Sequence, residues 1–282
     1  KEIIRDMPIK RNKPDHYVDN KEFLKLMLEF KEETESLTSG NTLKNHDVSK
    51  MEMEKDQVPE GTKVRRLYEP CTYYPVFRDY SESPKMLECI ESLIGPNIIC
   101  HYSKLNMKPP KIGAIVEWHQ DLSYYPLTNR DSLAVLLYLD DATNENGCLK
   151  ILPNSHKEPL MDHSKDGLFH GLITEDFDTS NSIDIEGKAG TAIFMNCMTP
   201  HSSNQNRSPF PRRTLIVSYR SSDAYPILIN NRDKTPEKFA RLVKGKELSN
   251  ARFTMDYFPI PKYREDLISL YQLQEKARNG AL

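Results

Sequence analysis

The sequence predicts a mainly β protein in which helices surround one antiparallel β-core. Short β-prone runs recur through the middle of the 282-residue chain, at 98–107, 132–139, 148–152, 191–195 and 214–219. Turns of Pro, Gly, Asn and Asp separate these runs, and helical spacing of apolar residues occurs before and after them. Repeated short strands with such turns are typical of an antiparallel sandwich or barrel.

The region before the core, residues 1–95, is predicted to be helical with loops. Asn20 can cap a helix from about 21 to 35, where apolar residues recur at helical spacing. Ser, Asn, Lys, Glu and Asp dominate residues 36–63, and we expect a mobile loop or a lid there. Pro84 and Gly95 mark the beginning and the end of a second predicted helix.

The region after the core, residues 235–282, is predicted to be helical as well. Thr235-Pro236-Glu237 begins one helix, and apolar residues on neighbouring turns predict a last helix from about 264 to 278. The sequence contains no internal repeat. We therefore expect a single domain over 1–282, with its β-core at about 96–223.

The charge balance argues against nucleic acid and membrane as partners. Lys and Arg number 39 against 41 Asp and Glu, so the chain is nearly neutral. No stretch approaches the roughly 18 consecutive apolar residues of a membrane span. We expect a small-molecule substrate rather than nucleic acid or a bilayer, and the composition leaves the oligomeric state open.

Five cysteines occur in the chain, and no two are close in sequence. An odd, scattered set argues against a disulfide scaffold and against a cysteine-based zinc site. Free thiols are typical of a reducing compartment, so we expect a cytoplasmic protein. The chain begins at Lys1 rather than Met, which leaves a lost targeting segment open.

The central motif is Trp118-His119-Gln120-Asp121. On a strand, residues i and i+2 point to the same face, so His119 and Asp121 can reach one metal ion. With a second, distant histidine they would form the two-His-one-carboxylate triad of non-haem iron(II). Taken alone, a His-x-Asp pair is more often a surface ion pair.

Four later histidines could complete the triad: His156, His163, His170 and His201. His201 is favoured because it follows a turn and a predicted strand, in a loop that can present a ligand. Arg212 lies eleven residues further on, and an arginine fork suits the carboxylate of a co-substrate. The alternative for Arg212 is a solvated arginine at the start of a strand.

Over about 96–223 the sequence resembles the phytanoyl-CoA dioxygenase family, which also contains the ectoine hydroxylases. Four stretches carry the resemblance: 119–126 (His-Gln-Asp-Leu-Ser-Tyr-Tyr-Pro), 146–157 (Asn-Gly-Cys-Leu-Lys-Ile-Leu-Pro-Asn-Ser-His-Lys), 169–171 (Phe-His-Gly) and 201–212 (His-Ser-Ser-Asn-Gln-Asn-Arg-Ser-Pro-Phe-Pro-Arg). The N-terminal 95 residues do not clearly match, so the identity of the substrate does not carry over.

The resemblance implies a double-stranded β-helix (a cupin-like jelly roll) and an Fe(II)- and 2-oxoglutarate-dependent dioxygenase. It implies iron bound by His119, Asp121 and His201, and a hydroxylation that consumes O2 and releases succinate and CO2. It also implies that 2-oxoglutarate is bound by Arg212, Ser203 and Lys108.

Several assignments stay open beside the resemblance. Arg213 is the alternative to Arg212, and Lys104 is a weaker candidate than Lys108. Asn146-Gly147 reads as a tight turn and His156 as a packing residue, while His170 is either a substrate contact or a loop residue. Side chains that could line a substrate pocket, or only pack, are Tyr124, Tyr125 and Arg220.

The reaction and the substrate also have alternatives. In the related halogenases a small residue replaces the carboxylate so that chloride can bind; with Asp121 in place, the resemblance implies hydroxylation rather than halogenation. Desaturation, cyclisation or epimerisation could use the same iron site. A cupin-like metal protein without 2-oxoglutarate chemistry and a catalytically silent binding module are the rival classes. The substrate is either an acyl-CoA or a small polar metabolite.

Overall fold

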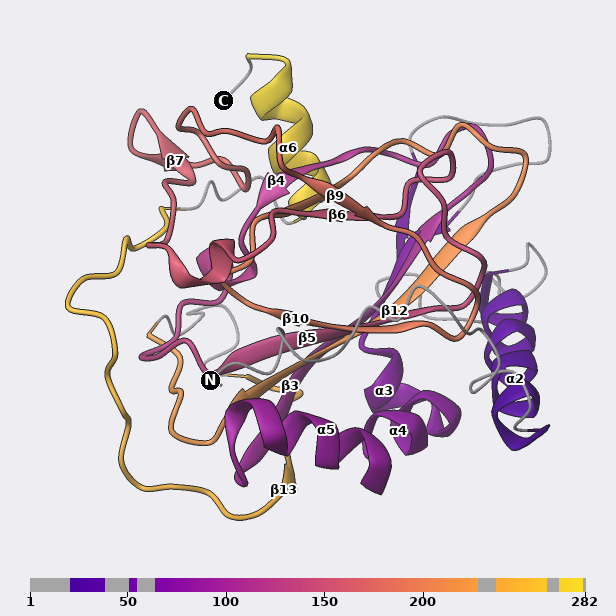
Figure 1. Ribbon diagram of the computed structural model, residues 1–282, viewed down its shortest axis with the longest axis horizontal. Coiled ribbons are helices and arrows are strands. Elements are labelled where there is room, and N and C mark those ends of the chain that lie inside the picture. The colour runs from indigo at the N-terminus through magenta and orange to yellow at the C-terminus, as the bar shows by residue number, and fades with distance from the viewer. Residues whose placement is uncertain (1–20, 39–50, 55–63, 228–236, 263–268, 281–282) are drawn as a thin grey trace.

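Two antiparallel sheets face each other in the computed structural model, which describes residues 21–38, 51–54, 64–227, 237–262 and 269–280 (Figure 1). The larger sheet has the order β1-β2-β3-β12-β5-β10, and β13 also pairs with β3. Its strands are β1 (Met51–Met53), β2 (Val64–Tyr68), β3 (Ile98–Lys108), β5 (Ser132–Tyr138), β10 (Ala192–Asn196), β12 (Arg212–Ser221) and β13 (Arg241–Lys244).

The smaller sheet has the order β4-β11-β6-β9. Its strands are β4 (Val116–His119), β6 (Leu149–Ile151), β9 (Ile183–Ile185) and β11 (His201–Ser203), and a separate hairpin is formed by β7 (Ser164–Lys165) and β8 (Leu168–Phe169). In both sheets, strands far apart in sequence are neighbours, such as β3 with β12 and β4 with β11. This arrangement is the double-stranded β-helix that the sequence resemblance implied, and that prediction is confirmed.

The larger sheet has one face against helices and one face toward the smaller sheet (Figure 1). On the helical side, Leu105 of β3, Leu137 of β5 and Leu215 of β12 lie in one row across three paired strands. They pack in a buried cluster with Phe77 of α4 (Pro75–Ser81) and Ile90 of α5 (Pro84–Ile94). This cluster is the main apolar core, and alternation along each strand sends the intervening residues inward.

Of the remaining helices, α2 (Lys21–Thr38) and α3 (Pro70–Tyr73) contribute to the same core on the helical side, and α6 (Leu270–Arg278) lies against the smaller sheet. α2 contacts α4, α3 contacts β3, and α6 contacts β4. Two short 3-10 helices, η3 (Asp121–Ser123) and η4 (Ser155–Lys157), follow β4 and β6. None of the helices in the described ranges has the length and apolar content that a membrane span requires.

The predicted helices in the first third of the chain are confirmed. α2 runs three residues beyond the predicted end at 35. α5 begins at Pro84 and ends before Gly95, whose positive φ of 95° is a backbone conformation that glycine adopts without a Cβ penalty. The strands predicted from 98–107 to 214–219 are also present, each with ends shifted by at most two residues.

Two predictions were wrong in part. The loop predicted at 36–63 contains strand β1, which pairs with β2; residues 39–50 and 55–63 lie outside the described part. A helix was predicted from Thr235, but 237–239 form a turn and β13 follows as a strand. In both segments, hydrogen bonds to a neighbouring strand determine the backbone conformation. The local sequence pattern does not predict this pairing.

The last predicted helix, 264–278, corresponds to α6, which begins later; 263–268 lie outside the described residues. Ser269 is its N-cap, and its side-chain oxygen accepts a hydrogen bond from the Gln272 backbone N–H at 3.2 Å. The same hydroxyl lies 2.6 Å from a carboxylate oxygen of Glu52 in β1. Through this contact the C-terminal helix is attached to the edge of the larger sheet.

Candidate metal centre

His119 and His201 lie directly opposite each other on paired strands of the smaller sheet. His119 is the last residue of β4 and His201 is the first residue of β11, and the two are cross-strand partners. Directly opposed residues have side chains about 5 Å apart at Cβ, and these two rings have centroids 4.1 Å apart. The prediction that His201 lies in a loop was wrong, because pairing with β4 makes it part of strand β11.

Asp121 completes the group. It begins the 3-10 helix η3 rather than continuing the strand, but Gln120 between it and His119 is extended, with φ −116° and ψ 132°. The i, i+2 alternation is therefore preserved. Asp121 Oδ1 lies 4.0 Å from His119 Nε2 and 3.9 Å from His201 Nε2. Among the described residues, these are the three His, Cys, Asp or Glu side chains whose ligand atoms converge, all within 4.8 Å.

Both histidines are held with Nε2 free to bind a metal ion. His119 Nδ1 lies 2.8 Å from the Glu117 carbonyl oxygen and His201 Nδ1 lies 2.9 Å from the Thr199 carbonyl oxygen. Each Nδ1–H therefore donates to backbone, which leaves the lone pair on Nε2. Burial lowers the pKa of both imidazoles, so both stay neutral at physiological pH.

Gln120, between the two ligands of β4 and η3, ties three segments together. Its side-chain N–H donates to the Met198 carbonyl at 2.7 Å, and its side-chain oxygen accepts from the Met161 N–H at 2.8 Å. Met198 lies just before β11, so one fully buried amide connects both ligand-bearing segments. No role was predicted for Gln120, although its position between the predicted ligands His119 and Asp121 indicated that its side chain lies near the site.

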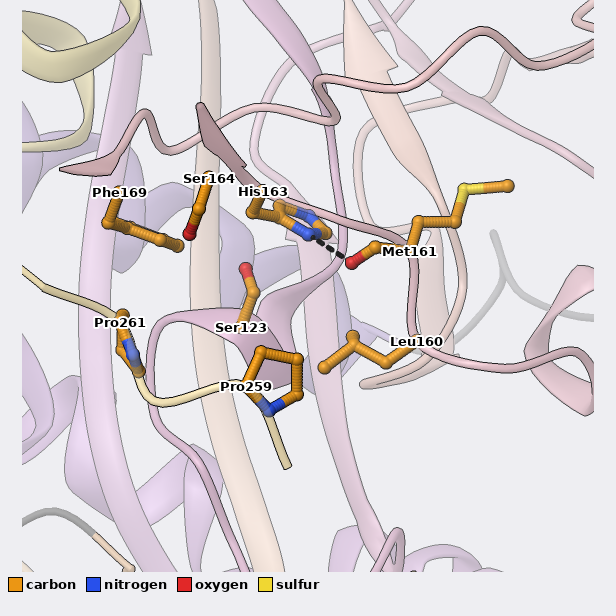
Figure 2. Close-up of a pocket in the computed structure, with 8 residues that line it drawn as sticks. All are labelled: Ser123, Leu160, Met161, His163, Ser164, Phe169, Pro259 and Pro261. Atoms are coloured by element: carbon orange, nitrogen blue, oxygen red, sulfur yellow. Dashed lines mark hydrogen bonds between the residues drawn. The ribbon is translucent and has the colours of Figure 1, made fainter. Parts of the chain in front are cut away.

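His163 lies next to the metal centre and contacts the backbone of Gln120, between the two ligands His119 and Asp121. Figure 2 shows His163 with the residues around it. Its Nδ1–H donates to the Met161 carbonyl at 2.8 Å, and its Nε2 accepts from the Gln120 backbone N–H at 3.0 Å. The cavity beside it measures about 10 Å³, too small for more than a water molecule. His163, one of the candidate ligands in the sequence, is thus a neutral positioning residue rather than a ligand.

A second polar group lies on the inner face of the larger sheet. Arg212, at the start of β12, is buried and faces Lys108 as its cross-strand partner. Its guanidinium donates to Thr214 Oγ1 at 2.8 Å and to the Gly147 carbonyl at 2.5 Å, while its Nε has no partner in the described residues. Burial lowers the pKa of Arg212, and no carboxylate lies within ion-pair distance of it in the described parts.

The neighbouring Arg213 points to the opposite face. Its guanidinium pairs with Asp140 at 2.7 Å and with Glu35 of α2 at 3.1 Å. A one-residue step along a strand reverses the side-chain direction, so only one of the two arginines can face inward. The structure brings Arg212, not Arg213, to the inner face.

Lys108 is buried beside Arg212, but backbone carbonyls already surround its ammonium group. Its Nζ donates to the Ala114 carbonyl at 2.5 Å and to the Asn204 carbonyl at 2.6 Å, with the Ser203 carbonyl at 3.5 Å. Burial and the charge of Arg212 lower the pKa of Lys108 well below its usual value. Ser203, buried at the end of β11, follows His201 on the same strand face.

The Asn146-Gly147 turn supports this end of the site. Gly147 has a φ of 79°, and a Cβ there would collide with the Asn204 carbonyl oxygen. Its own carbonyl accepts from Arg212, as described above. A residue that the sequence indicated only as a turn therefore also anchors the buried guanidinium.

Other predicted residues are distributed around the site. The Tyr124 hydroxyl donates to the Gly171 carbonyl, and its ring packs edge-on against His119 at 5.6 Å. Tyr125 is largely buried, and its hydroxyl has no hydrogen-bond partner in the described residues. Arg220 forms an ion pair with Glu237, which makes it a structural residue.

The remaining two histidine candidates do not join the triad. His156 lies half-buried in η4, and His170 lines a surface groove next to α6.

The fold and this donor set define a class: double-stranded β-helix proteins that hold a metal ion between two histidines and a carboxylate. Within that class, the chain belongs to the phytanoyl-CoA dioxygenase (PhyH) family of Fe(II)- and 2-oxoglutarate-dependent oxygenases, whose sequence profile matches residues 23–214. The family membership implied by the sequence motifs is confirmed.

Relatives with curated descriptions have different substrates. Over 177 residues the chain is 36% identical to a probable alpha-ketoglutarate-dependent hypophosphite dioxygenase of Stutzerimonas stutzeri, covering 60% of this chain and 62% of that protein. Over 166 residues it is 30% identical to a methylphosphonate hydroxylase of Gimesia maris, covering 59% and 62%. The aligned region thus spans about three fifths of the length of these relatives.

A solved structure supports the fold. EctD from S. alaskensis, crystallised with 2-oxoglutarate and 5-hydroxyectoine, superposes with a TM-score of 0.62 at 20% identity, covering 85% of this chain and 82% of that chain. At this identity the likeness establishes the shared jelly roll and leaves the substrate undefined.

Proposed function

We propose that this protein is an Fe(II)- and 2-oxoglutarate-dependent dioxygenase that hydroxylates a small molecule, with release of succinate and CO2. The iron ligands in this proposal are His119, Asp121 and His201. The observation that carries it is the convergence of two neutral imidazoles and one carboxylate within 4.8 Å. That donor set suits Fe(II) and leaves coordination positions for a bidentate oxo acid and dioxygen.

The chemistry divides between the metal and the chain. Bound Fe(II) supplies the activation of dioxygen that couples decarboxylation of 2-oxoglutarate to oxidation of the substrate. The protein's part is orientation: the Glu117 and Thr199 carbonyls fix the rings of His119 and His201 with Nε2 toward the ion. Gln120 holds the two ligand segments at a constant separation.

Arg212 is proposed to bind the distal carboxylate of 2-oxoglutarate. A guanidinium has five N–H donors, and the contacts to Thr214 and Gly147 use two of them. The remaining donors, Nε–H included, lie in a buried site without an anionic partner in the described residues. A carboxylate would satisfy both the donors and the charge, which is why the residues fit the co-substrate.

Lys108 and Ser203 have supporting roles in this proposal. Lys108 lies beside Arg212 and holds the Ala114 and Asn204 segments together through its hydrogen bonds to their carbonyls. Ser203 adds a hydroxyl on the strand face of His201. We also propose that the chain forms one oxygenase domain and acts in the cytoplasm, in line with its five free cysteines.

Anaerobic titration of the Fe(II)-loaded protein with 2-oxoglutarate tests the proposal. We expect a metal-to-ligand charge-transfer band in the wild type and none in His119→Ala or His201→Ala. His156→Ala is the matched control, since it removes a histidine outside the triad. Absence of the band in the wild type would contradict the function, and a cupin-like protein without 2-oxoglutarate chemistry would give that result.

A further inference from the structure

The C-terminal helix α6 places a buried glutamine against the strand that carries His119. Gln274 is 0% exposed. Its side-chain oxygen accepts a hydrogen bond from the Glu117 backbone N–H in β4 at 2.9 Å, and its side-chain N–H donates to the Gly171 carbonyl at 2.6 Å. One amide group therefore connects α6, β4 and the segment after β8, which are distant from one another in sequence.

Strand β4 lies at the end of the smaller sheet. β11 pairs with it on one side, and no other strand of the described residues pairs with it. A buried backbone N–H without an acceptor costs free energy comparable to a lost hydrogen bond. Gln274 supplies the acceptor for the Glu117 N–H where the sheet offers no further strand.

The residue that Gln274 holds is the one that orients His119. The Glu117 carbonyl accepts a hydrogen bond from His119 Nδ1–H at 2.8 Å, which leaves Nε2 directed toward the other two ligands. The N–H of Glu117 is bound by Gln274, and its C=O binds the ligand ring. Because both groups belong to one residue, a change in its backbone dihedrals would displace the carbonyl that holds the ring.

A second path from Gln274 to His119 runs through Gly171. The Gly171 carbonyl accepts from the Gln274 side chain and from the Tyr124 hydroxyl, so both of its lone pairs are used. The Tyr124 ring packs edge-on against the His119 ring, with centroids 5.6 Å apart. Both contacts that fix the His119 ring, the Glu117 carbonyl and the Tyr124 ring, thus depend on Gln274.

The neighbours of Gln274 hold α6 in place for these bonds. Leu273 packs with Phe169 in a small buried cluster, and the Tyr124 ring packs against Phe169 with centroids 5.0 Å apart. One turn after Gln274, Arg278 lies on the same helix face and pairs with the Glu117 carboxylate at 2.9 Å. The position of the buried amide is therefore determined by the packing of the whole helix.

His201 is oriented by a different group. Its Nδ1–H donates to the Thr199 carbonyl at 2.9 Å. The two hydrogen bonds of the Gln274 side chain go to Glu117 and Gly171, on the His119 side of the metal centre. A loss of the amide is therefore expected to affect the two ligand histidines unequally.

We propose that Gln274 is a positioning residue of the metal centre, which keeps His119 in the orientation that binds the metal ion. This role rests on the proposed function, in which His119 is a metal ligand. Gln274 acts through backbone and Tyr124, without contacting the metal itself. Groups that hold a ligand histidine typically contribute tenfold to a hundredfold to metal affinity, and we expect the lower end because Gln274 lies one step further out.

Co(II) binding to the metal-free protein tests the proposal without turnover and without 2-oxoglutarate. Co(II) accepts the same nitrogen and oxygen ligands as Fe(II), and visible absorption in competition with a chelator measures its dissociation constant. We expect Gln274→Met to weaken Co(II) binding about tenfold. Gln272→Met is the matched control, since it makes the same substitution two residues away on α6, and it should keep the affinity within about twofold.

Proton NMR of the Co(II)-loaded protein separates positioning from a general loosening of the fold. The paramagnetic ion shifts the Nδ1–H protons of its two ligand histidines away from the other signals. In Gln274→Met we expect one of these protons to exchange with water about tenfold faster, because the carbonyl that holds His119 is no longer fixed. The other proton, that of His201, should exchange as in the wild type.

Tyr124→Phe is a milder second variant, for use if Gln274→Met does not fold. It removes the hydroxyl that donates to Gly171 and keeps the ring against His119. We expect a smaller loss of Co(II) affinity than in Gln274→Met, with the same selective change at one Nδ1–H proton. No selective change in either variant would overturn the proposal.

The remaining outcomes distinguish this role from the proposed function. Unchanged Co(II) affinity in Gln274→Met would overturn the role, and so would equal changes at both Nδ1–H protons, because a loosened fold affects both ligands. These results with normal Co(II) binding in the wild type leave the function intact. A wild type that binds no Co(II) through its histidines refutes the metal centre, and the proposed function with it.

Discussion

The two faces of the larger sheet are built from the same strands and have opposite characters. In the row that faces the helices, Leu215 pairs with Leu105 and Leu137, and all three are buried in the main core. One residue earlier along β12, Thr214 pairs with Asn106 on the inner face. Alternation by a single residue thus separates the face that stabilises the fold from the face that holds polar groups.

The difference lies in what each face requires of its residues. The helical face removes apolar surface from water, which is the main favourable contribution to folding. The inner face carries Lys108 and Arg212, whose burial opposes folding unless anions or carbonyls compensate. Residues that weaken a fold without an internal compensation are expected at functional sites. Variants that affect one face only can test this division.

The largest expected effect distinguishes adjacent arginines on opposite faces. Arg212→Met removes the proposed partner of the 2-oxoglutarate carboxylate, and loss of a bidentate charged contact lowers kcat/KM for 2-oxoglutarate about a thousandfold. Arg213→Met loses an ion pair with Asp140 on the helical face and should keep kcat/KM within about threefold. Steady-state kinetics of succinate formation measure both. Equal losses in the two variants would abolish the distinction.

A core substitution should give the converse result. Leu215→Ala creates a cavity in the fully buried row on the helical face, and we expect a loss of about 2–5 kcal/mol in the free energy of unfolding. Turnover per folded molecule should change less than twofold. Urea denaturation measures the free energy of unfolding. Titration of the Fe(II)-loaded protein with 2-oxoglutarate gives the concentration of intact sites, to which the turnover is normalised. A large fall in turnover at unchanged stability would mean that the two faces are coupled.

An acid-dependent loss of stability is expected behind the metal centre. Burial lowers the pKa of His163 from 6.5 to about 4 in the folded protein. The unfolded chain therefore takes up the proton first as pH falls below 6.5, and the stabilisation is lost progressively toward pH 4. Between pH 6.5 and 5 the change is about 2 kcal/mol, at 1.36 kcal/mol per pH unit.

His163→Gln isolates this effect, since its amide can still donate to Met161 and accept from Gln120. Chemical denaturation of the metal-free wild type and variant at pH 7.5, 6.5 and 5 measures the difference. We expect the wild type to lose more stability than the variant on acidification. Parallel curves would show that protonation of His163 is not linked to folding.

The smallest expected effect concerns the helix that covers the edge of the inner face. Ser269→Ala removes the N-cap of α6 and its contact with Glu52, for an expected loss of about 1 kcal/mol. Ser269→Asp tests the cap separately, because it restores the acceptor but places a second carboxylate beside Glu52. Thermal melts of the three proteins give the comparison, and a melting temperature of Ser269→Ala equal to that of the wild type would contradict the capping role.

Sequence reasoning was most successful where local patterns and side-chain chemistry coincide. The strands at 98–107 and 214–219 are recognisable because β-prone residues continue through buried positions. His119, Asp121 and His201 were identified through ligand chemistry and family motifs, and the structure brings them together. The jelly roll itself was predicted from the resemblance rather than from any periodicity.

Features that depend on pairing between distant strands were missed. β1 (Met-Glu-Met) and β13 (Arg-Leu-Val-Lys) are too short to show a clear pattern, and their pairing with neighbouring strands makes them strands. The choice between Arg212 and Arg213 required the register of β12, which a one-residue shift would reverse. His163 looked like a candidate ligand, because a histidine that accepts a backbone hydrogen bond has no sequence signature.

The cross-strand pairing of His119 with His201 has a consequence for how the protein matures. The two strands that carry these ligands are far apart in the chain, so the unfolded polypeptide offers no preformed chelate. Tight metal binding can begin only after β4 and β11 have paired, late in the assembly of a topology rich in distant contacts. Iron supply and folding yield should therefore rise and fall together in the cell, with the apoprotein as the more easily unfolded species.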